Sequence, residues 1–429
     1  MSAERGRAQP PGRRSGDAGK SPHGQGRWPA KGGAERPALV QFGAGNIGRS
    51  FVGQLFARAG WEVVFVDVNP RIVEALNRER RYRVVIKRNA LPDETILIEG
   101  VRAIDGRNTA EVAGAIAGAS LLATSVGKNA LPAVFPVIAE GLSARLRARA
   151  AEPLDIVIAE NIRGAAAIFR EELTRLLPSD YPFERLVGLV ETSIGKMVPI
   201  MTAEDLAIDP LWVFAEEYNT LILDRAAFRG EIPDVAGLHP VANIAAYVDR
   251  KLFVHNLGHA ATAYLGFAFD RRFTYIWEPL EAEELCARVA LAMRQAAVAL
   301  SREYPADLSM PDLDAHIADL LFRFRNRALG DTIYRVGRDL YRKLDREDRL
   351  VGAMLLAARH GLPFDAIASA LRAATDFRAT DESGSLFPAD RDFAEREASR
   401  GIPAVLRDVC RLDAANPLDV RIIEAVLKG

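Results

Sequence analysis

A glycine-rich turn between two short apolar stretches constrains the fold of this chain more than any other feature. Residues 38–42 (Ala-Leu-Val-Gln-Phe) have the length and apolar character of a buried strand, and the turn at 43–48 (Gly-Ala-Gly-Asn-Ile-Gly) follows directly. The pattern then predicts a helix that ends at Gly60 and a second strand over 62–67 (Glu-Val-Val-Phe-Val-Asp). This order of strand, glycine turn, helix and strand indicates the first unit of a Rossmann-type, doubly wound α/β sheet.

The glycines of the turn have physical roles in dinucleotide binding. Gly43 permits the tight turn, Gly45 lets the backbone approach a pyrophosphate, and Gly48 allows helix and strand to pack closely. The helix N-terminus adds free N–H groups and the positive end of the helix dipole. We therefore expect cofactor contacts from the whole turn: Gly43, Ala44, Gly45, Asn46, Ile47 and Gly48.

An acid ends the second predicted strand. Asp67 lies 24 residues after Gly43, where its carboxylate suits the two ribose hydroxyls of the adenosine half and repels a 2′-phosphate. Asp67 therefore favours NAD over NADP as the cofactor. FAD stays open as an alternative, because flavoproteins use the same glycine turn.

The alternation of strands and helices continues to about residue 200. Strands are predicted over 121–125, 155–159 and 186–190, and ligands of doubly wound sheets bind at the carboxyl ends of the strands. Taken singly, each residue at such an end is an ordinary turn residue, but together these residues outline one crevice: Thr124, Ser125, Gly127, Asn161 and Glu191. We expect Thr124 and Val126 to contact the cofactor.

The first 36 residues differ in composition from the rest. They hold eight Lys or Arg, three Asp or Glu and twelve Gly or Pro, with almost no apolar residue. Such a segment buries too little surface to offset the entropy of ordering, so we expect 1–36 to be a disordered basic tail. No apolar stretch follows Arg13-Arg14, which excludes an export signal. A linker or start-site extension and a basic arm for an anionic partner both stay open.

The composition of the whole chain restricts the class of protein. The net charge of −1 gives no reason to expect a nucleic-acid partner, and no apolar run reaches the length of a membrane span. Two distant cysteines, Cys286 and Cys410, argue against a disulfide framework and against a cysteine-ligated zinc. We expect a cytoplasmic protein of two domains that binds neither nucleic acid nor membrane, with a monomer and a dimer both open.

The second half of the chain reads as helices. Apolar residues recur at three- and four-residue spacing from about residue 240, which predicts a mainly helical substrate and catalytic domain over 201–429 after a Rossmann domain over 37–200. One predicted helix, over 241–266, carries three polar groups. At about 100° per residue, Asn256 lies about 140° round from Lys251, and His259 lies between them.

These three groups suit a reaction that moves a proton. A desolvated lysine such as Lys251 has a lowered pKa and can accept a proton. An amide beside it can donate a hydrogen bond to an oxygen that becomes negative. Polar residues on a helix usually form a solvent-exposed face. Here an active site is favoured instead, because a dinucleotide-binding turn precedes these residues in the chain.

A cationic stretch follows further along the chain. It contains Arg335, Arg338, Arg342 and Lys343, and then Arg346 and Arg349. Arginine binds carboxylate or phosphate through two parallel hydrogen bonds, so the stretch suits an anionic or polyhydroxylated substrate. The alternative is an ion-pair network with the acids of the same region: Asp331, Asp339, Asp345 and Asp348.

Three stretches together resemble the polyol-specific long-chain dehydrogenases, the mannitol dehydrogenase family. They are residues 42–49 with 67–69, residues 250–266 with their Lys, four residues, Asn, two residues, His pattern, and residues 335–338 with 342–344. The resemblance extends from about residue 38 to the C-terminus.

The resemblance implies a zinc-independent hydride transfer between NAD and a secondary alcohol of a polyol or sugar phosphate. Carried over by position, it implies that Lys251 is the general base and that His259 orients the substrate hydroxyl. It implies that Asn161 and Asn256 polarise the reacting oxygen.

The same resemblance bears on the far end of the substrate, where Arg335 and Lys343 are implied contacts. It is incomplete after the last strand of the nucleotide domain. The family pattern is Val-Asp-Arg-Ile-Val-Pro, whereas residues 194–199 read Ile-Gly-Lys-Met-Val-Pro, so Gly195 replaces an acid. The nearby Glu191 is the expected substitute.

We expect the chain to interconvert mannitol 1-phosphate and fructose 6-phosphate. A free hexitol or a hexuronate-derived acid is the alternative substrate, as in mannitol 2-dehydrogenase or fructuronate and tagaturonate reductases, because the cationic stretch suits phosphate and carboxylate equally. A non-catalytic NADH-binding protein is an alternative from a different class. Gly195 favours that alternative, and the intact Lys251, Asn256 and His259 argue against it.

Overall fold

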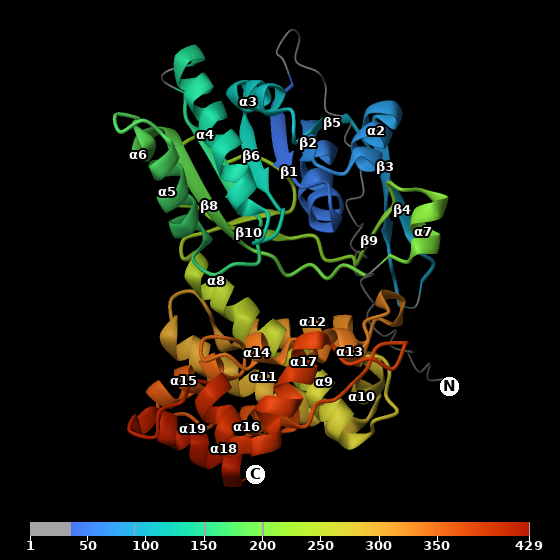
Figure 1. Cartoon of the computed structure of the whole chain (residues 1–429), viewed down its shortest axis with the longest axis vertical. Coiled ribbons are helices and arrows are strands. Elements are labelled where there is room, and N and C mark those ends of the chain that lie inside the picture. Colours follow the sequence, from blue (N-terminus) through green and yellow to red (C-terminus); the bar gives the residue numbers. More distant parts are fainter. Residues whose placement is uncertain (1–35, 90, 150–151, 200, 429) are drawn as a thin grey trace, which may run out of the picture. The chain divides into compact units, whose positions relative to one another are not determined.

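Eight strands form one sheet in the order β11-β10-β8-β7-β6-β1-β2-β5 (Figure 1). The structure is a computed structural model that describes residues 36–89, 91–149, 152–199 and 201–428. The expected tail over 1–36 lies outside the described residues except for Arg36. The strands of this sheet are β1 Ala38–Phe42, β2 Glu62–Asp67, β5 Val101–Asp105, β6 Leu121–Thr124, β7 Leu154–Ile158, β8 Val187–Ser193, β10 Leu221–Asp224 and β11 Leu238–Val241.

The strand order reverses at β1. From β1 the chain proceeds outwards to β2 and β5 on one side, and later to β6, β7 and β8 on the other, with every pair parallel. The reversal leaves the carboxyl ends of β1 and β6 side by side, which is where ligands bind in doubly wound sheets. The predicted Rossmann-type sheet is therefore confirmed.

Helices cover both faces of the sheet because its strands are apolar on both sides. Leu39 and Phe65 enter one buried apolar cluster, whereas their neighbours Val40 and Val64 enter another. Alternate residues of a strand point to opposite faces, so each cluster is the core of one face. The helices are the π segment Gly48–Gly53, α1 Gln54–Arg58, α2 Pro70–Glu79, α3 Thr109–Gly118, α4 Leu131–Ala148, α5 Ala165–Leu176 and α6 Phe183–Leu186.

A second sheet has the order β4-β3-β9, with β3 Arg81–Ile86, β4 Glu94–Glu99 and β9 Val213–Ala215. Strands β9, β10 and β11 lie beyond residue 200, at which the sequence suggested a division into domains. Strand β10 nevertheless pairs antiparallel with β8 of the large sheet. The chain therefore returns to the nucleotide half before it enters the helices.

The rest of the described chain is mainly helical, as predicted. Its helices are α7 Ala203–Ile208, α8 Ile244–Arg250, the π segment Lys251–Asn256, α9 Leu257–Phe269, α10 Trp277–Glu281, α11 Glu283–Glu303, α12 Met310–Phe324, α13 Ile333–Gly337, α14 Leu340–Lys343, α15 Val351–Arg359, α16 Asp365–Thr375, α17 Pro388–Arg396, α18 Ile402–Ala404, the π segment Val405–Val409 and α19 Pro417–Lys428, with short 3-10 turns at Arg327–Leu329 and Ala398–Arg400.

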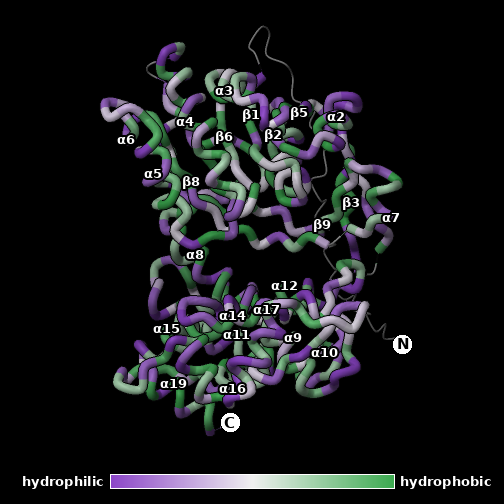
Figure 2. Tube along the Cα trace, in the orientation of Figure 1, coloured by the Kyte–Doolittle hydropathy of each residue, from purple (hydrophilic) through white to green (hydrophobic). Residues whose placement is uncertain are grey.

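Helix α11 is the centre of the helical core. Its buried residues, among them Leu285, Val289 and Met293, recur every three to four positions and form one face. That face contacts α9, α12, α15 and α16. Figure 2 shows hydrophobic and hydrophilic residues interspersed along the helices, and within the described residues no helix is long and apolar enough to cross a membrane.

A buried ion pair joins helix α12 to the chain that follows β8 and β9. Arg323 Nε donates to Glu216 Oε2 over 2.7 Å, and the two side chains are only 8% and 3% exposed. The same groups hold the backbone near residue 196, because Glu216 Oε1 accepts from Met197 N–H and Arg323 Nη2 donates to the Gly195 carbonyl, each over 2.5 Å. The pair therefore fixes the segment 195–197 against α12.

Replacing Arg323 with Met should destabilise the protein by about 3–5 kcal/mol, because Glu216 would keep a buried charge without a partner. Denaturant unfolding of the variant measures this change. The matched control is Arg294→Met, which removes an exposed pair with Asp314 (60% and 46% exposed) and should cost about 0–1 kcal/mol. Equal losses in the two variants would contradict a special role for the buried pair.

Candidate active site

The glycine turn after β1 adopts a conformation that requires two of its glycines. Gly43 has a φ of +88°, and a Cβ atom there would lie 2.6 Å from the Ser125 carbonyl oxygen. A Cβ atom at Gly48 would lie 1.9 Å from the Gly43 carbonyl oxygen. At Gly45, by contrast, no atom lies within 4 Å of that position. The turn is closed on its inner side and open at Gly45, which fits a bound pyrophosphate.

Asp67 at the end of β2 supports the same turn. Its Oδ2 accepts from the Ala44 N–H over 2.7 Å, and its Oδ1 accepts from the Asn69 N–H over 2.9 Å. The carboxylate therefore lies beside the turn.

Glu160 ties the ends of β6 and β7 together. This residue is 6% exposed, and its two carboxylate oxygens accept from the N–H groups of Val126 and Gly127 over 2.8 and 2.9 Å. Burial raises the pKa of Glu160, and the two N–H donors oppose that rise. Thr124 is fully buried at the end of β6, so it packs beneath this edge of the sheet and is not exposed on it.

Two pockets meet at Lys251. The turn-side pocket, of about 350 Å³, extends from Ile47, Ser125 and Gly127 to His255. The helix-side pocket, of about 280 Å³, is lined among others by Arg163, Arg342 and Arg349. Five residues line both pockets: Glu160, Asn161, Ile194, Lys251 and Asn256. A ligand in either pocket would therefore lie next to the predicted lysine and both predicted asparagines.

Lys251 is a partly buried amine held in a defined direction. Its Nζ donates a hydrogen bond to Asn161 Oδ1 at the end of β7. Burial lowers the pKa of Lys251 to about 8, the guanidinium of Arg349 acts in the same direction, and Asp348 opposes it. A pKa near the working pH is the property that a general base requires.

A π-helical segment over Lys251–Asn256 interrupts the predicted helix. A π turn closes its hydrogen bond between residues five apart, whereas an α turn joins residues four apart. Lys251 and Asn256 are five apart, so they lie one above the other on one face. The separation of about 140° that α-helical geometry gives was therefore wrong, and the π segment brings the amine and the amide together.

His259 lies on the same helix, one turn beyond Asn256. Burial lowers its pKa to about 3, and Arg335 and Lys343 lower it further, so the imidazole is neutral at neutral pH. The ring stacks on Phe324 with 4.7 Å between ring centres. Its Nε2 is buried and has no hydrogen-bond partner within the described residues, although Asp331 Oδ2 lies 3.5 Å away. Buried polar atoms normally have a partner, but His259 is not among the residues that line either pocket.

The two predicted contacts for the far end of the substrate line neither pocket. Arg335 pairs with Asp331 and donates to the Val198 carbonyl over 3.2 Å. Lys343 is 5% exposed, and its Nζ donates to the Val336 carbonyl over 2.5 Å. Burial holds the pKa of Lys343 well below its usual range.

The cationic stretch also forms the ion-pair network that was its alternative interpretation. Arg342 Nε lies 2.5 Å from Asp339 Oδ2, and Arg349 Nε lies 2.7 Å from Asp348 Oδ1. Arg342 and Arg349 both line the helix-side pocket. The guanidinium groups that the cationic stretch contributes to the pocket beside Lys251 are therefore these two, both already paired with acids.

Comparison with known proteins adds to this geometry. The sequence matches the model of the mannitol dehydrogenase Rossmann domain over residues 37–237 and that of the mannitol dehydrogenase C-terminal domain over residues 243–409. The chain belongs to the mannitol dehydrogenase family. A mannitol-1-phosphate 5-dehydrogenase of Brevibacillus brevis is 33% identical over 386 residues, which is 89% of this chain and 95% of that protein.

Solved structures of low sequence identity share the mannitol dehydrogenase fold. A Pseudomonas fluorescens mannitol 2-dehydrogenase, in a ternary complex with NAD and D-mannitol, superposes with a TM-score of 0.70 at 16% identity, over 92% of this chain and 91% of that one. A substrate-free D-sorbitol dehydrogenase superposes with a TM-score of 0.73 at 16% identity, over 91% and 93% of the chains.

Glu191 lines neither pocket of this mannitol dehydrogenase family member. Its Oε1 accepts from the Ala166 N–H over 2.7 Å, at the N-terminus of α5. A carboxylate there satisfies a free N–H and interacts favourably with the helix dipole.

A side chain would fit at Gly195, because the nearest atoms to a Cβ atom built there belong to the Tyr218 ring, at 3.4 Å and beyond.

Lys196 lines the turn-side pocket but was not among the predicted site residues. It is 6% exposed and donates to the Tyr218 carbonyl over 2.8 Å and to Asn219 Oδ1 over 3.0 Å. Burial lowers its pKa to about 7. The departure from the family pattern at 194–199 is the only sequence signal for it, because its burial depends on residues more than twenty positions away.

Within the ranges that the structure describes, no group of three or more His, Cys, Asp or Glu side chains lies close enough to hold a metal ion.

The residues suited to hold a dinucleotide are those of the glycine turn, Asp67, and Val126 and Gly127 after strand β6.

Proposed function

We propose that this chain is an NAD-dependent dehydrogenase that oxidises a secondary alcohol of a polyol, with Lys251 as the general base. One observation carries the proposal: an amine with a pKa of about 8 lies on the wall that the turn-side and helix-side pockets share. The carboxylate of Asp67 beside the turn supports NAD rather than NADP. The NAD complex of the mannitol 2-dehydrogenase of the same fold agrees with this choice.

The residues around Lys251 divide the work of the reaction. Lys251 in its neutral form takes the proton of the substrate hydroxyl. Asn161 presents its Oδ1 to Lys251, which leaves its Nδ2 group to donate to the reacting oxygen. Asn256 reaches the same oxygen because the π segment places it on the lysine's face. NAD, when bound, supplies the nicotinamide ring that accepts the hydride from the substrate carbon.

His259 is proposed to orient a second hydroxyl of the substrate. Its imidazole is neutral, so one ring nitrogen donates and the other accepts a hydrogen bond. The buried Nε2 without a partner is satisfied when a hydroxyl binds, and a hydroxyl can serve either tautomer. A polyol offers several such hydroxyls, which agrees with the family.

Mannitol 1-phosphate, with fructose 6-phosphate as product, is the substrate that we propose. The relative from Brevibacillus brevis is a mannitol-1-phosphate 5-dehydrogenase, and the helix-side pocket contains Arg163, Arg342 and Arg349. Arg335 and Lys343 line neither pocket, so the predicted contact of either with the far end of the substrate would require it to leave Asp331 or the Val336 carbonyl.

A free hexitol is the second candidate, and one observation favours it. Each arginine of the helix-side pocket already has a carboxylate partner, since Arg163 Nη2 lies 2.8 Å from Asp249 Oδ1 and Arg342 and Arg349 pair with Asp339 and Asp348. A phosphate would have to share these guanidinium groups with the acids, whereas an uncharged hexitol would not.

Assays of the purified enzyme with NADH distinguish the substrates. The kcat/KM for fructose 6-phosphate should exceed that for fructose by about 100-fold, the equivalent of one strong charge-assisted hydrogen bond of about 3 kcal/mol. Fructuronate and tagaturonate complete the panel. Turnover of fructose without turnover of fructose 6-phosphate would replace the phosphorylated substrate with the free hexitol.

Replacing Lys251 with Met should lower kcat for alcohol oxidation by about 10²- to 10⁴-fold, the usual contribution of a general base. In the wild type the oxidation rate should rise with pH and level off above about 8, because only the neutral amine accepts a proton. Carbonyl reduction requires the protonated amine, so its rate should fall through the same range.

The control for this variant is Lys428→Met, at a lysine whose side chain is 75% exposed on α19, and it should change neither rate. NADH binding, measured by fluorescence titration, should persist in the Lys251→Met variant. Wild-type turnover in that variant would rule out Lys251 as the base.

Replacing Asp67 with Ala should relax the preference for NAD over NADP by about tenfold or more, because the carboxylate no longer repels a 2′-phosphate. Titration with both cofactors measures the ratio. The control is Asp105→Ala at the end of the neighbouring strand β5, where Asp105 pairs in register with Asp67 and binds Arg107. Tighter binding of NADP than of NAD by the wild type would contradict the assignment.

A further inference from the structure

Arg49 follows Gly48 in the dinucleotide turn. It has no part in the proton and hydride transfer proposed for Lys251 and its neighbours. Its side chain is buried, with 2% of the residue exposed. The guanidinium donates from Nε to the Ala44 carbonyl over 2.6 Å and from Nη1 to the Leu211 carbonyl over 2.7 Å. Its own carbonyl accepts from the Tyr82 hydroxyl over 2.7 Å. Arg49 therefore connects the turn to two distant parts of the chain.

The charge of Arg49 lies beneath the turn without a directly paired acid. Within the described residues no carboxylate lies within ion-pair distance of its guanidinium, and Asp67 and Asp209 act on it only at longer range. Burial lowers the pKa of Arg49 to about 10, so it stays protonated at neutral pH. A buried charge held only by carbonyl groups is costly. A doubly charged pyrophosphate on the other side of the turn would stabilise it.

The bond to Ala44 also sets the direction of a backbone donor. The Ala44 carbonyl and the Gly45 N–H belong to one planar trans peptide group, so they point in opposite directions. Because buried Arg49 holds the Ala44 carbonyl inwards, the Gly45 N–H points away from the guanidinium, and a Cβ atom built on Gly45 would meet no neighbouring atom within 4 Å. The side away from the guanidinium is where a phosphate oxygen would accept this N–H.

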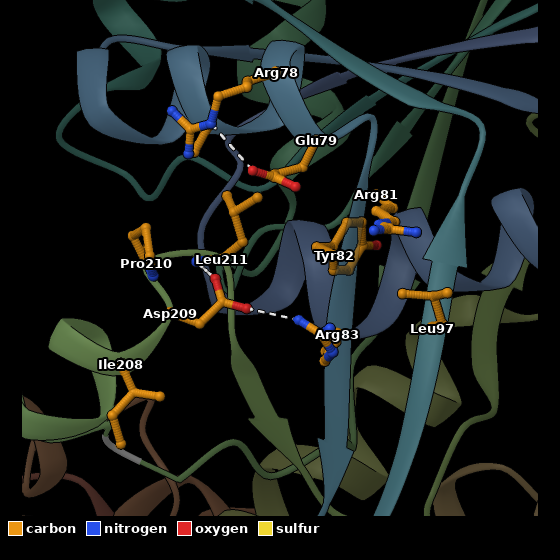
Figure 3. A pocket seen from close by; sticks show the side chains of 11 residues that line it. Arg78, Glu79, Arg81, Tyr82, Arg83, Leu97, Ile208, Asp209, Pro210 and Leu211 are labelled. Atoms are coloured by element: carbon orange, nitrogen blue, oxygen red, sulfur yellow. Dashed lines mark hydrogen bonds and ion pairs between the residues drawn. The ribbon is translucent and has the colours of Figure 1, made fainter.

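The other anchor of Arg49 is itself fixed. Asp209 Oδ1 accepts from the Leu211 N–H over 2.9 Å, and Asp209 Oδ2 lies 3.1 Å from Arg83 Nη1 on β3. Figure 3 shows Leu211, Asp209, Arg83 and Tyr82 around one surface pocket. Arg83 of the second sheet is therefore connected through Asp209 to Leu211, whose carbonyl accepts from Arg49.

We propose that Arg49 is a positioning residue for cofactor binding, which holds the Ala44 carbonyl inwards so that the Gly45 N–H meets the pyrophosphate and which supplies a positive charge beneath it. This role rests on the proposed binding of NAD. Arg49 touches neither the substrate nor the reacting atoms, so its effect belongs to cofactor affinity and not to the chemical step.

The test measures NADH dissociation constants by fluorescence titration for the wild type and for Arg49→Met. The variant should bind NADH at least about tenfold more weakly, one strong hydrogen bond to a charged group. At saturating NADH its kcat and its KM for fructose 6-phosphate should change less than about twofold. ADP should lose affinity in parallel with NADH, whereas adenosine, which lacks the phosphates, should bind as it does to the wild type.

Arg145 provides a matched control. It is also a buried arginine, 5% exposed, whose guanidinium donates to the carbonyl groups of Ala117, Ala119 and Pro153 over 3.0, 2.8 and 3.1 Å. None of these belongs to the glycine turn. Arg145→Met should lower the melting temperature without a selective loss of NADH or ADP affinity.

The possible results distinguish a failure of the proposed NAD binding from a failure of the proposed role of Arg49. A wild type that binds no NADH contradicts the proposed function itself. A wild type that binds NADH, together with an Arg49→Met variant that binds it equally well, overturns the role of Arg49. Equal weakening of ADP and adenosine, or equal weakening by Arg49→Met and Arg145→Met, also overturns it, because a general structural loss would explain both.

Arg49→Lys decides the question if the Met variant does not fold. Lysine keeps the charge but has one terminal donor group instead of a fork, so it cannot reproduce both carbonyl contacts. NADH should bind about threefold or more weakly to this variant than to the wild type. Unchanged affinity for NADH and ADP would overturn the positioning role.

Discussion

The buried ion pair between Glu216 and Arg323 is the interaction on which the candidate site depends. Its two side chains hold the backbone of Gly195 and Met197 and so fix Lys196 between them. Ile194, which immediately precedes this segment, lines both pockets, and Lys196 lines the turn-side pocket. A charge pair with so little exposure is tolerated only when hydrogen bonds satisfy both partners, and here the pocket wall supplies those bonds.

A local distortion of one helix completes the arrangement. The π segment over Lys251–Asn256 brings the amine and the amide onto one face, opposite the end of β7, where Asn161 accepts the lysine's hydrogen bond. A second π segment, Gly48–Gly53, begins in the dinucleotide turn and carries Arg49. Such segments are rare and recur at functional sites. In this chain the segment over Lys251–Asn256 places Asn256 where α-helical geometry would not direct it.

Burial shifts several titratable groups of the candidate site towards their neutral forms. The pKa of Lys251 falls to about 8, that of Lys196 to about 7 and that of His259 to about 3. Positive neighbours add to burial at each of these groups, Arg349 at Lys251 and Arg335 at His259. The site can therefore exchange protons near neutral pH, while the charge of Arg49 is retained beneath the cofactor turn.

The sequence by itself determined the Rossmann-type sheet, the mainly helical second half and membership of the mannitol dehydrogenase family. The first two follow from local signals, since apolar periodicity and the spacing of Gly43, Gly45 and Gly48 act within a few residues, whereas the family follows from the resemblance of three separate stretches to its known members. Lys251 and Asn161 could be singled out from motif and strand end, but their contact could not, because 90 positions separate them.

Only the tertiary structure decided the details of the site. It paired Arg335 with Asp331, engaged Glu191 at the start of α5, buried Lys196 against residues 218–219 and closed the π turn at Lys251. The physical reason is the same for each. The burial, the hydrogen-bond partners and the pKa of a side chain depend on atoms from segments that are distant in the sequence. A local sequence pattern does not show which distant segments will pack against it.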